Sequence, residues 1–318
     1  MTTVFTYGRH PAYLYLLSHC DAEFVIPKAW EEDTRPRPNN VRYITESEVP
    51  AALAGADVWL SHLITPDLLY FIRSYTKVES SPRIIQIMHG RADRAGTIRS
   101  GPLALLYRTV KQQITPILDV LPQALDIEYV YITDYVAQSW GMSPGTVIYP
   151  GALLDEIELG SHSESYPLTV GNDLGRPHFA GDILSELNNE LEMWVCGAND
   201  STEYSPGYVS WTELISLYQS CCCYLNLLRP PENSFNLATI EAMCAGTPII
   251  TLSHPKSIFT HRKNALVCES VEEIVYWVER LKSEKALRMR LGTAARSLAE
   301  EMFSMESFID NWESLLHS

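Results

Sequence analysis

The chain has 318 residues, 46% of them hydrophobic and 20% charged, which is the composition of a soluble globular protein with room for two domains. A formal net charge of −15 argues against attraction of the whole surface to nucleic acid or anionic lipid. No apolar run reaches the roughly 18–20 residues that span a bilayer. The start lacks a signal peptide's basic segment and cleavage site, and the seven cysteines form no C-x-x-C pair. We therefore expect a cytoplasmic protein.

Strand and helix signals alternate through the first half of the chain, which predicts a parallel sheet flanked by helices. In open sheets of this kind, ligands bind beyond the carboxyl ends of the strands. Gly8 and His10 follow the first predicted strand, and His89 follows a clearly buried one, so all three are candidates for a binding edge. The predicted strands are 3–7, 23–27, 41–45, 56–60, 83–88 and 129–133, and the predicted helices start at 11 and 66 or cover 102–121 and 134–140.

A basic segment follows His89 in this otherwise acidic chain. Between Gly90 and Lys111 the only acid is Asp93. We expect the segment on the acceptor side of a site, where it suits an anionic acceptor or a membrane headgroup at the inner membrane face. A plain packing helix over 102–121 is the alternative. The cationic residues are Arg91, Arg94, Arg99, Arg108 and Lys111.

The alternation of elements starts again after a strand and turn at 145–151. The triplet Cys221-Cys222-Cys223 leads into one of the later strands and is typical of a buried strand of small side chains. The predicted strands are 168–171, 193–197, 222–227 and 249–252, and the predicted helices are 180–191, 212–220, 271–282, 284–302 and 303–316.

The most informative stretch runs from Pro230 to Pro255. A polar loop opens a helix at about Asn236, Glu241 lies on its first turns, and Gly246 ends it. A helix N-terminus offers backbone N–H groups and a positive dipole end, which suits a diphosphate. A carboxylate about a turn further on can accept hydrogen bonds from the hydroxyls of a neighbouring sugar or ribose.

This stretch resembles the donor-site motif of retaining nucleotide-sugar glycosyltransferases with the GT-B fold, of the group 1 or family 4-like kind. In that motif a Glu-x-Phe-Gly loop precedes a helix with Glu-Ala-Met and then a Gly-x-Pro turn. Phe235, the run 241–243 and the turn 246–248 match it. The family's first Glu falls on Asn233, with Glu232 one residue early, so either Asn233 replaces it or the loop presents Glu232.

The resemblance implies two Rossmann-like domains that face each other across a cleft. It places an acceptor-side domain at 1–148, a donor domain at 149–302, and a helix at 303–318 that crosses back to the first domain. The turn at 145–151 is similar to the family's interdomain linker.

Roles for single residues also follow from the resemblance. Glu241 would hold the nucleotide ribose, and Asn233 or Glu232 the donor sugar. Arg176 is the candidate cation for the diphosphate, although the family's arginine directly after the strand glycine falls on Asn172. The other expected donor-binding positions are Gly197, Val209, Phe235, Asn236 and Leu237.

In the first domain, the resemblance puts His89 beside the reactive carbon of the donor sugar, as a catalytic candidate. His10 is the second candidate there. Gly8, Arg91 and Arg94 are expected with His10 on the acceptor side.

Motifs of other enzyme classes are missing from the chain. It contains no Asp-x-Asp and no His/Cys cluster with metal-ligand spacing, so we expect neither a metal nor another cofactor. The expected reaction moves a sugar from a UDP- or GDP-linked donor to a glycan or lipid-linked saccharide, with a modified base in DNA as the alternative acceptor. A nucleotide-sugar epimerase of the same fold and a non-catalytic partner subunit are the rival interpretations.

Overall fold

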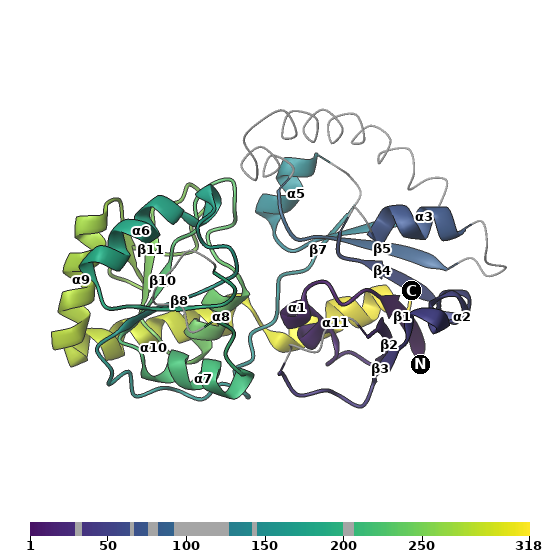
Figure 1. The fold of residues 1–318 in the computed structure, drawn as a ribbon, viewed down its shortest axis with the longest axis horizontal. Helices are drawn as coiled ribbons and strands as arrows, with labels where there is room; N and C mark the ends of the chain where they lie inside the picture. Colours follow the sequence, from purple (N-terminus) through teal and green to yellow (C-terminus); the bar gives the residue numbers. More distant parts are fainter. Residues whose placement is uncertain (29–33, 64–66, 76–81, 92–126, 142–144, 200–206) are drawn as a thin grey trace. The chain divides into compact units, whose positions relative to one another are not determined.

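The structure is a computed structural model that describes residues 1–318 except 29–33, 64–66, 76–81, 92–126, 142–144 and 200–206. The described residues form two compact units, one of Met1–Gly151 with Glu306–Ser318 and one of Ala152–Met305. Each unit has its own parallel sheet with helices packed against it (Figure 1). The helix predicted over 102–121 and the cationic residues from Arg94 to Lys111 lie outside the described residues.

The first unit contains a seven-stranded parallel sheet in the order β3-β2-β1-β4-β5-β6-β7. Its inner strands are almost continuously apolar, because helices cover both faces of a parallel sheet. β1 pairs with β2 on one side and with β4 on the other, so the chain reverses direction across the sheet at β1. Such a switch point opens a crevice beyond the carboxyl ends of the two strands. The strands are β1 (Thr2–Thr6), β2 (Ala22–Pro27), β3 (Val41–Ile44), β4 (Val58–Ser61), β5 (Arg83–Met88), β6 (Ile127–Tyr131) and β7 (Thr146–Val147).

The helices of the first unit start and stop at recognisable residues. α1 begins with Pro11 at its first position, and α5 is capped by the Thr133 hydroxyl, which accepts from the N–H of Val136. Gly141 ends α5 in the left-handed conformation, at φ 59°. α2 had not been predicted from the sequence. The helices are α1 (Pro11–Leu17), α2 (Val49–Gly55), α3 (Leu69–Tyr75), α5 (Asp134–Trp140) and α11 (Met305–Leu316).

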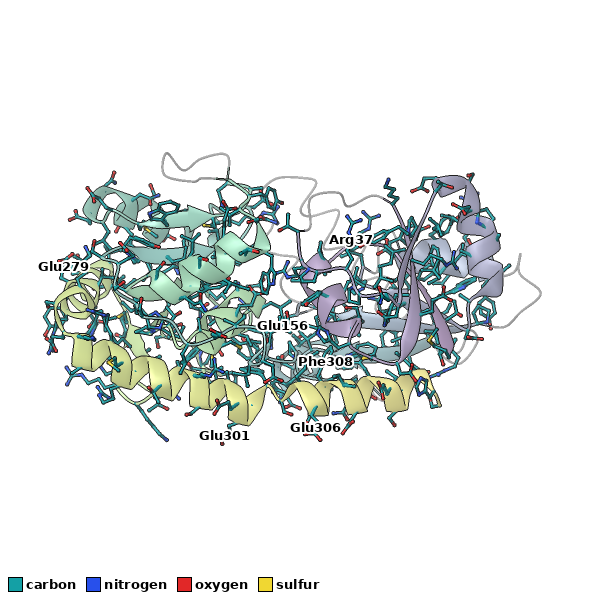
Figure 2. The ribbon with its side chains drawn as sticks, turned by 90° about the horizontal axis from the view of Figure 1, so that it is seen from below. Arg37, Glu156, Glu279, Glu301, Glu306 and Phe308 are labelled. Atoms are coloured by element: carbon teal, nitrogen blue, oxygen red, sulfur yellow. The ribbon has the colours of Figure 1, made fainter. Side chains whose placement is uncertain are left out.

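α11 completes the first unit although it follows the whole of the second unit in sequence. Phe308 and Trp312 are buried, and their rings lie 5.8 and 6.4 Å from the ring of Tyr13 on α1. In Figure 2, Phe308 lies on the inner side of the helix and Glu306 on its outer side. Arg83 at the start of β5 donates to the carbonyl of Leu315 at 2.8 Å. The helix is therefore anchored by apolar packing and by polar contacts at its last turn.

The second unit contains a five-stranded parallel sheet in the order β12-β11-β10-β8-β9. Here β8 pairs with β9 on one side and β10 on the other, so the switch point lies between β8 and β10. The triplet of cysteines is buried and its three thiols are free, as predicted for a strand of small side chains. The strands are β8 (Pro167–Val170), β9 (Trp194–Cys196), β10 (Cys223–Asn226), β11 (Ile249–Leu252) and β12 (Leu266–Cys268), the last not predicted from the sequence.

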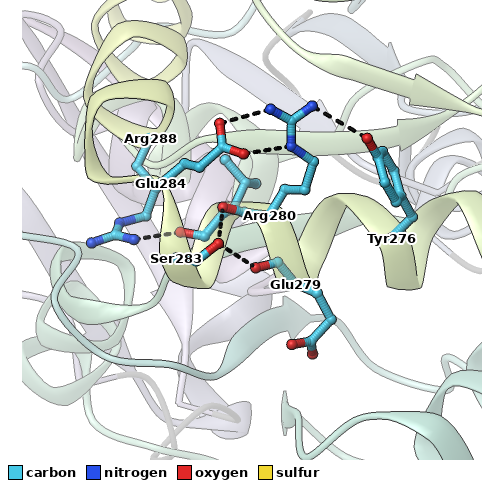
Figure 3. Close-up of polar contacts among 7 residues, drawn as sticks. Tyr276, Glu279, Arg280, Ser283, Glu284 and Arg288 are labelled. Atoms are coloured by element: carbon cyan, nitrogen blue, oxygen red, sulfur yellow. Dashed lines mark hydrogen bonds and ion pairs between the residues drawn. The ribbon is translucent and has the colours of Figure 1, made fainter.

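Helices cover both faces of this second sheet: α6 packs against α9, and α8 packs against both α7 and α10. The turn between α9 and α10 is fixed by polar contacts (Figure 3). Arg280 grips the Glu284 carboxylate with two hydrogen bonds of 2.6 and 2.8 Å, and Arg288 donates to the carbonyls of Leu281 and Lys282 at the end of α9. None of the described helices is long and apolar enough to cross a membrane. The helices are α6 (Gly181–Glu190), α7 (Trp211–Ser220), α8 (Leu237–Cys244), α9 (Val271–Ser283) and α10 (Lys285–Met302).

His162 caps the end of α8 and makes the stability of the second unit depend on pH. Its buried ring donates from Nε2 to the carbonyl of Ala245 at 3.2 Å, and burial lowers the pKa of His162 below its usual value. Because the unfolded chain then binds more protons, the free energy of unfolding falls as pH drops below about 6.5. We expect the melting temperature to fall between pH 7.5 and 5.5, and to fall less in His162→Asn. Equal falls in both proteins would contradict this role.

Candidate active site

The loop and helix that follow β10, where we expect the donor site, have the predicted secondary structure. Asn236 caps α8: its Oδ1 accepts from the N–H of Thr239 at 2.9 Å, and its own backbone is extended. Gly246 ends the helix with a φ of 71°, a conformation that favours glycine, and Pro248 follows two residues on. These local signals place the N-terminus of α8 at the carboxyl end of the sheet.

A buried amide holds the loop in front of α8. Asn226, the last residue of β10, donates from Nδ2 to the carbonyl of Ser234 at 2.7 Å and to the hydroxyl of Thr251 on β11 at 3.0 Å. All three side chains are buried. The position of the loop is therefore set by the ends of two core strands, which limits its motion relative to the sheet.

Glu232 and Asn233, the two candidates for the donor sugar, lie side by side in this loop and are each 8% exposed. His254 supports them from the end of β11. The N–H of Lys256 donates to His254 Nδ1 at 3.0 Å, so Nε2 carries the proton and donates to the carbonyl of Glu232 at 3.0 Å. His254 thus has a structural role here, and both Glu232 and Asn233 stay candidates for the contact with the sugar.

Glu241 lies on the second turn of α8 and is 7% exposed. The hydroxyl of Tyr218 on α7 donates to Glu241 Oε2 at 3.0 Å. Tyr218 is fully buried, so the bond forms away from water and orients the carboxylate. No sequence pattern indicated this partner, because Tyr218 occupies an ordinary apolar position of an amphipathic helix.

Phe235 and Leu237 complete the predicted loop. Phe235 is buried and its ring packs against Phe303 at 4.9 Å, so it anchors the loop to the residue that follows α10. Leu237 is the first residue of α8. The first four N–H groups of a helix have no acceptor within it. With that of Thr239 capped by Asn236, the N–H groups of Leu237 and Ala238 are the nearest donors for an anion at this end.

Two hydrogen bonds join the loops that follow β8 and β9. Asn172 Oδ1 accepts from the N–H of Ala198 at 2.9 Å, and Asn199 Nδ2 donates to the carbonyl of Gly171 at 2.8 Å. Gly197 has a φ of 111°, and a Cβ there would lie 2.3 Å from the Gly171 carbonyl oxygen, so no larger residue fits. Asn172, which stands where the family has an arginine, therefore joins the two loops instead.

Val209 lies just before α7, two residues after Gly207, which pairs with Cys196 at the end of β9. It is half-buried, and Ser210 after it caps α7 by accepting from the N–H of Glu213. Trp211, the first residue of α7, is 6% exposed and packs in the interior. The structure thus places Gly197 and Val209 at the ends of neighbouring elements.

Two arginines flank the switch point, and each is paired with an aspartate. Arg176, after β8, forms an ion pair with Asp173, and both side chains are about half exposed. Arg229, after β10, donates to both carboxylate oxygens of Asp182 at the start of α6, at 2.8 and 3.0 Å. The N–H of Arg229 also donates to the carbonyl of His178, joining the segments after β8 and β10. Arg229 was not predicted from the sequence.

In the first unit, three histidines meet at the carboxyl ends of β1, β4 and β5. His10 and His89 were predicted candidates, and His62, directly after β4, was not. The rings of His10 and His89 are 4.1 Å apart, and His62 Nδ1 lies 2.9 Å from His89 Nε2. The missed signal was positional: His62 follows a buried strand as His89 does, next to the switch point between β1 and β4.

Burial shifts the pKa of two groups of the first unit, His62 and Asp67. His62 is 2% exposed, and burial, helped by the neighbouring charge of His10, holds the pKa of His62 well below its usual value. Asp67 is also buried, which raises the pKa of its carboxyl, although an ion pair with Arg9 at 3.2 Å opposes the shift. Among the described residues, no group of histidine, cysteine, aspartate and glutamate is placed to hold a metal ion.

The other predicted acceptor-side residues, Gly8, Arg91 and Arg94, lie in different surroundings. Gly8 lines a small cavity together with Arg37 and Tyr43. Arg91 stacks on the ring of Tyr135 at 3.9 Å and donates to the Tyr135 carbonyl at 2.8 Å, so part of its bonding capacity holds α5. Arg94 lies outside the described residues.

Known proteins share this architecture at low sequence identity. Residues 178–314 match the family described as glycosyl transferase-like. No protein of curated function matches the chain. HepE from Anabaena, solved with UDP-glucose, is 12% identical with a TM-score of 0.71, and the match covers 100% of both chains. Sucrose-phosphate synthase from Thermosynechococcus elongatus is 12% identical with a TM-score of 0.68, over 100% of this chain and 98% of that one.

A third structure, a glycosyltransferase from Rickettsia africae, is 11% identical with a TM-score of 0.61, over 99% of this chain and 97% of that one. Matches over whole chains at this identity establish the fold, and the family match covers most of the second unit. The chain therefore has the GT-B fold, and its residues 178–314 match the glycosyl transferase-like family.

Proposed function

We propose that the protein transfers a sugar from a UDP-linked donor, with retention at the anomeric carbon, to a glycan or lipid-linked saccharide. The observation that carries the proposal is the convergence of the α8 N-terminus, the loop 232–236 and buried Glu241 beside the switch point of the second sheet. Ligands of open α/β sheets bind at such points. UDP is preferred over GDP because HepE was solved with UDP and with UDP-glucose.

In this proposal the departing diphosphate is stabilised without a metal ion. The N–H groups at the start of α8 point at the anion and add the positive end of the helix dipole. Arg176 supplies a full positive charge once it exchanges its partner Asp173 for the phosphate. Preorganised donors of this kind stabilise charge that develops in the transition state.

The remaining roles follow the order of groups along the donor. Glu241, oriented by Tyr218, accepts hydrogen bonds from the ribose hydroxyls. Glu232 or Asn233 holds hydroxyls of the donor sugar, and His89 acts at the reacting carbon. The acceptor binds on the side of the first unit that carries Gly8 and His10, and the basic segment after Arg91 gives peripheral contact with an inner membrane face.

A thermal-shift screen tests the donor first. We expect UDP and one UDP-sugar to raise the melting temperature, because a ligand that binds only the folded state stabilises it. We expect GDP and ADP to have little effect.

An activity assay without acceptor follows the binding screen. We expect slow release of UDP from the UDP-sugar, at a rate that EDTA does not change. Conversion of the sugar nucleotide into an epimer would indicate the rival epimerase, and UDP binding without any turnover would indicate a non-catalytic subunit.

Arg176→Ala is expected to weaken binding of UDP by about tenfold while leaving uridine almost unaffected, because the arginine interacts with the phosphates alone. Calorimetric titration of both ligands measures the difference. Asp173→Asn provides the matched control: it releases Arg176 from its ion pair, so UDP affinity should rise. Equal losses for UDP and uridine in Arg176→Ala would place the arginine elsewhere.

A further inference from the structure

The three histidines of the first unit are arranged for a hydrogen bond between two of them. His62 Nδ1 and His89 Nε2 are 2.9 Å apart, whereas the ring centroids are 5.2 Å apart and the planes differ by 16°. A centroid separation so much longer than the N···N distance means that the two rings meet edge to edge, in the geometry of an N–H···N bond. His10 lies against His89, with ring centroids 4.1 Å apart.

When both histidines are neutral, a single proton lies between His62 Nδ1 and His89 Nε2, and either ring can be the one that donates it. If His89 donates from Nε2, the neutral His62 carries its own proton on Nε2. That nitrogen is buried and has no hydrogen-bond partner among the described residues. A buried N–H without an acceptor is among the rarest defects of folded proteins. If His62 donates from Nδ1, its Nε2 carries only a lone pair and no donor is left unsatisfied.

The surroundings do not favour a third arrangement with an extra proton. The rings packed against the pair are those of His10 after β1 and Tyr13 on α1. A positive charge on His62 would be buried beside His10. A protonated His62 is therefore disfavoured. A protonated His89 would donate from Nε2, which is the arrangement that leaves the Nε2–H of His62 without an acceptor among the described residues.

We propose that His62 is a positioning residue that donates from Nδ1 to Nε2 of His89 and so fixes the proton of His89 on Nδ1. Which ring nitrogen of a histidine is protonated is set by the bond that the other nitrogen makes. His89 consequently presents Nδ1 as a donor and cannot use Nε2 as one. The consequence for catalysis rests on the proposed function, whereas the tautomer itself does not.

Nitrogen NMR of the histidine rings tests the tautomer directly. In full-length protein labelled with ¹⁵N-histidine at pH 7.5, long-range ¹H–¹⁵N spectra should show His89 protonated at Nδ1, with its signals assigned by their loss in His89→Gln. His62→Phe keeps a ring of similar size but removes the donor, so His89 should change to the Nε2-protonated form. His62→Asn places an amide N–H near the position of Nδ1 and should restore the Nδ1 form.

His19→Gln is the control, because His19 is exposed and its Nδ1 lies 2.9 Å from the carbonyl of Tyr15 on α1. It should leave the signals of His89 unchanged. An Nε2-protonated His89 in the parent protein, or an Nδ1 form that persists in His62→Phe, would overturn the proposal.

Measuring the release of UDP from a UDP-sugar separates the positioning role of His62 from the proposed catalytic role of His89. If His89 acts at the reacting carbon, the kcat of release should fall in His62→Phe and recover in His62→Asn, while the thermal shift by UDP stays the same in both. A tautomer change in His62→Phe with no change in kcat would support the role of His62 and count against His89 as the catalytic group.

Discussion

Glu241→Gln should bind UDP about 10- to 100-fold more weakly than the parent protein, because hydrogen bonds to a charged group contribute about 1.5–3 kcal/mol. The carboxylate is buried on α8 and receives a hydrogen bond from Tyr218 at 3.0 Å. Glutamine has the same shape and can still accept from Tyr218, so the loss would come from the ligand contact and not from unfolding. Titration of UDP and measurement of the free energy of unfolding separate the two effects.

Tyr218→Phe is the partner experiment for Glu241. It removes one hydroxyl that orients the carboxylate but leaves the carboxylate in place, so UDP affinity should fall less than in Glu241→Gln. The double variant should be no weaker in UDP binding than Glu241→Gln alone, because the two side chains act through one contact. Parent-like affinity in folded Glu241→Gln would remove this residue from the donor site.

Trp312→Ala should lower the free energy of unfolding of the first unit by about 3–5 kcal/mol, the usual cost of removing a fully buried aromatic side chain. Trp312 packs against Tyr13 and is 0% exposed. Hydrogen exchange should show faster exchange in β1 and α1, with the strands of the second unit unchanged. Asp310→Ala, on the exposed side of the same helix, is the control and should change neither.

If exchange in β1 and α1 were unaffected by Trp312→Ala, α11 would contribute little to the first unit. If both units lost protection together, their unfolding would be a single transition and the assignment of the helix to one unit would be wrong.

The local elements of the candidate site were predictable from the sequence because their signals lie within one short segment. The cap at Asn236, the glycine end at Gly246 and the spacing from Phe235 to Glu241 lie within one short segment. The structure has the helix at these bounds. The same holds for β5 and the position of His89 at its carboxyl end.

The contacts that orient the site were not predictable, because they join elements whose proximity depends on the sheet order. Tyr218 meets Glu241 only because α7 packs against α8, and His62 meets His89 only because β4 pairs with β5. Nothing in the sequence indicated that Arg176 is paired with Asp173 or that Arg91 stacks on Tyr135. Polar partners of this kind follow from register, which one sequence does not reveal.

The place of α11 in the chain also orders events during synthesis. The ribosome releases the seven strands of the first unit before the second unit is made, yet the segment 306–318 that covers Tyr13 follows both. The nascent first unit therefore carries an uncovered apolar surface while residues 152–305 are translated, at about 5–20 residues per second. The second unit is continuous in sequence and can fold during that interval. A chaperone that binds exposed apolar surface should accordingly associate with nascent chains that stop before residue 306 and release those that include α11.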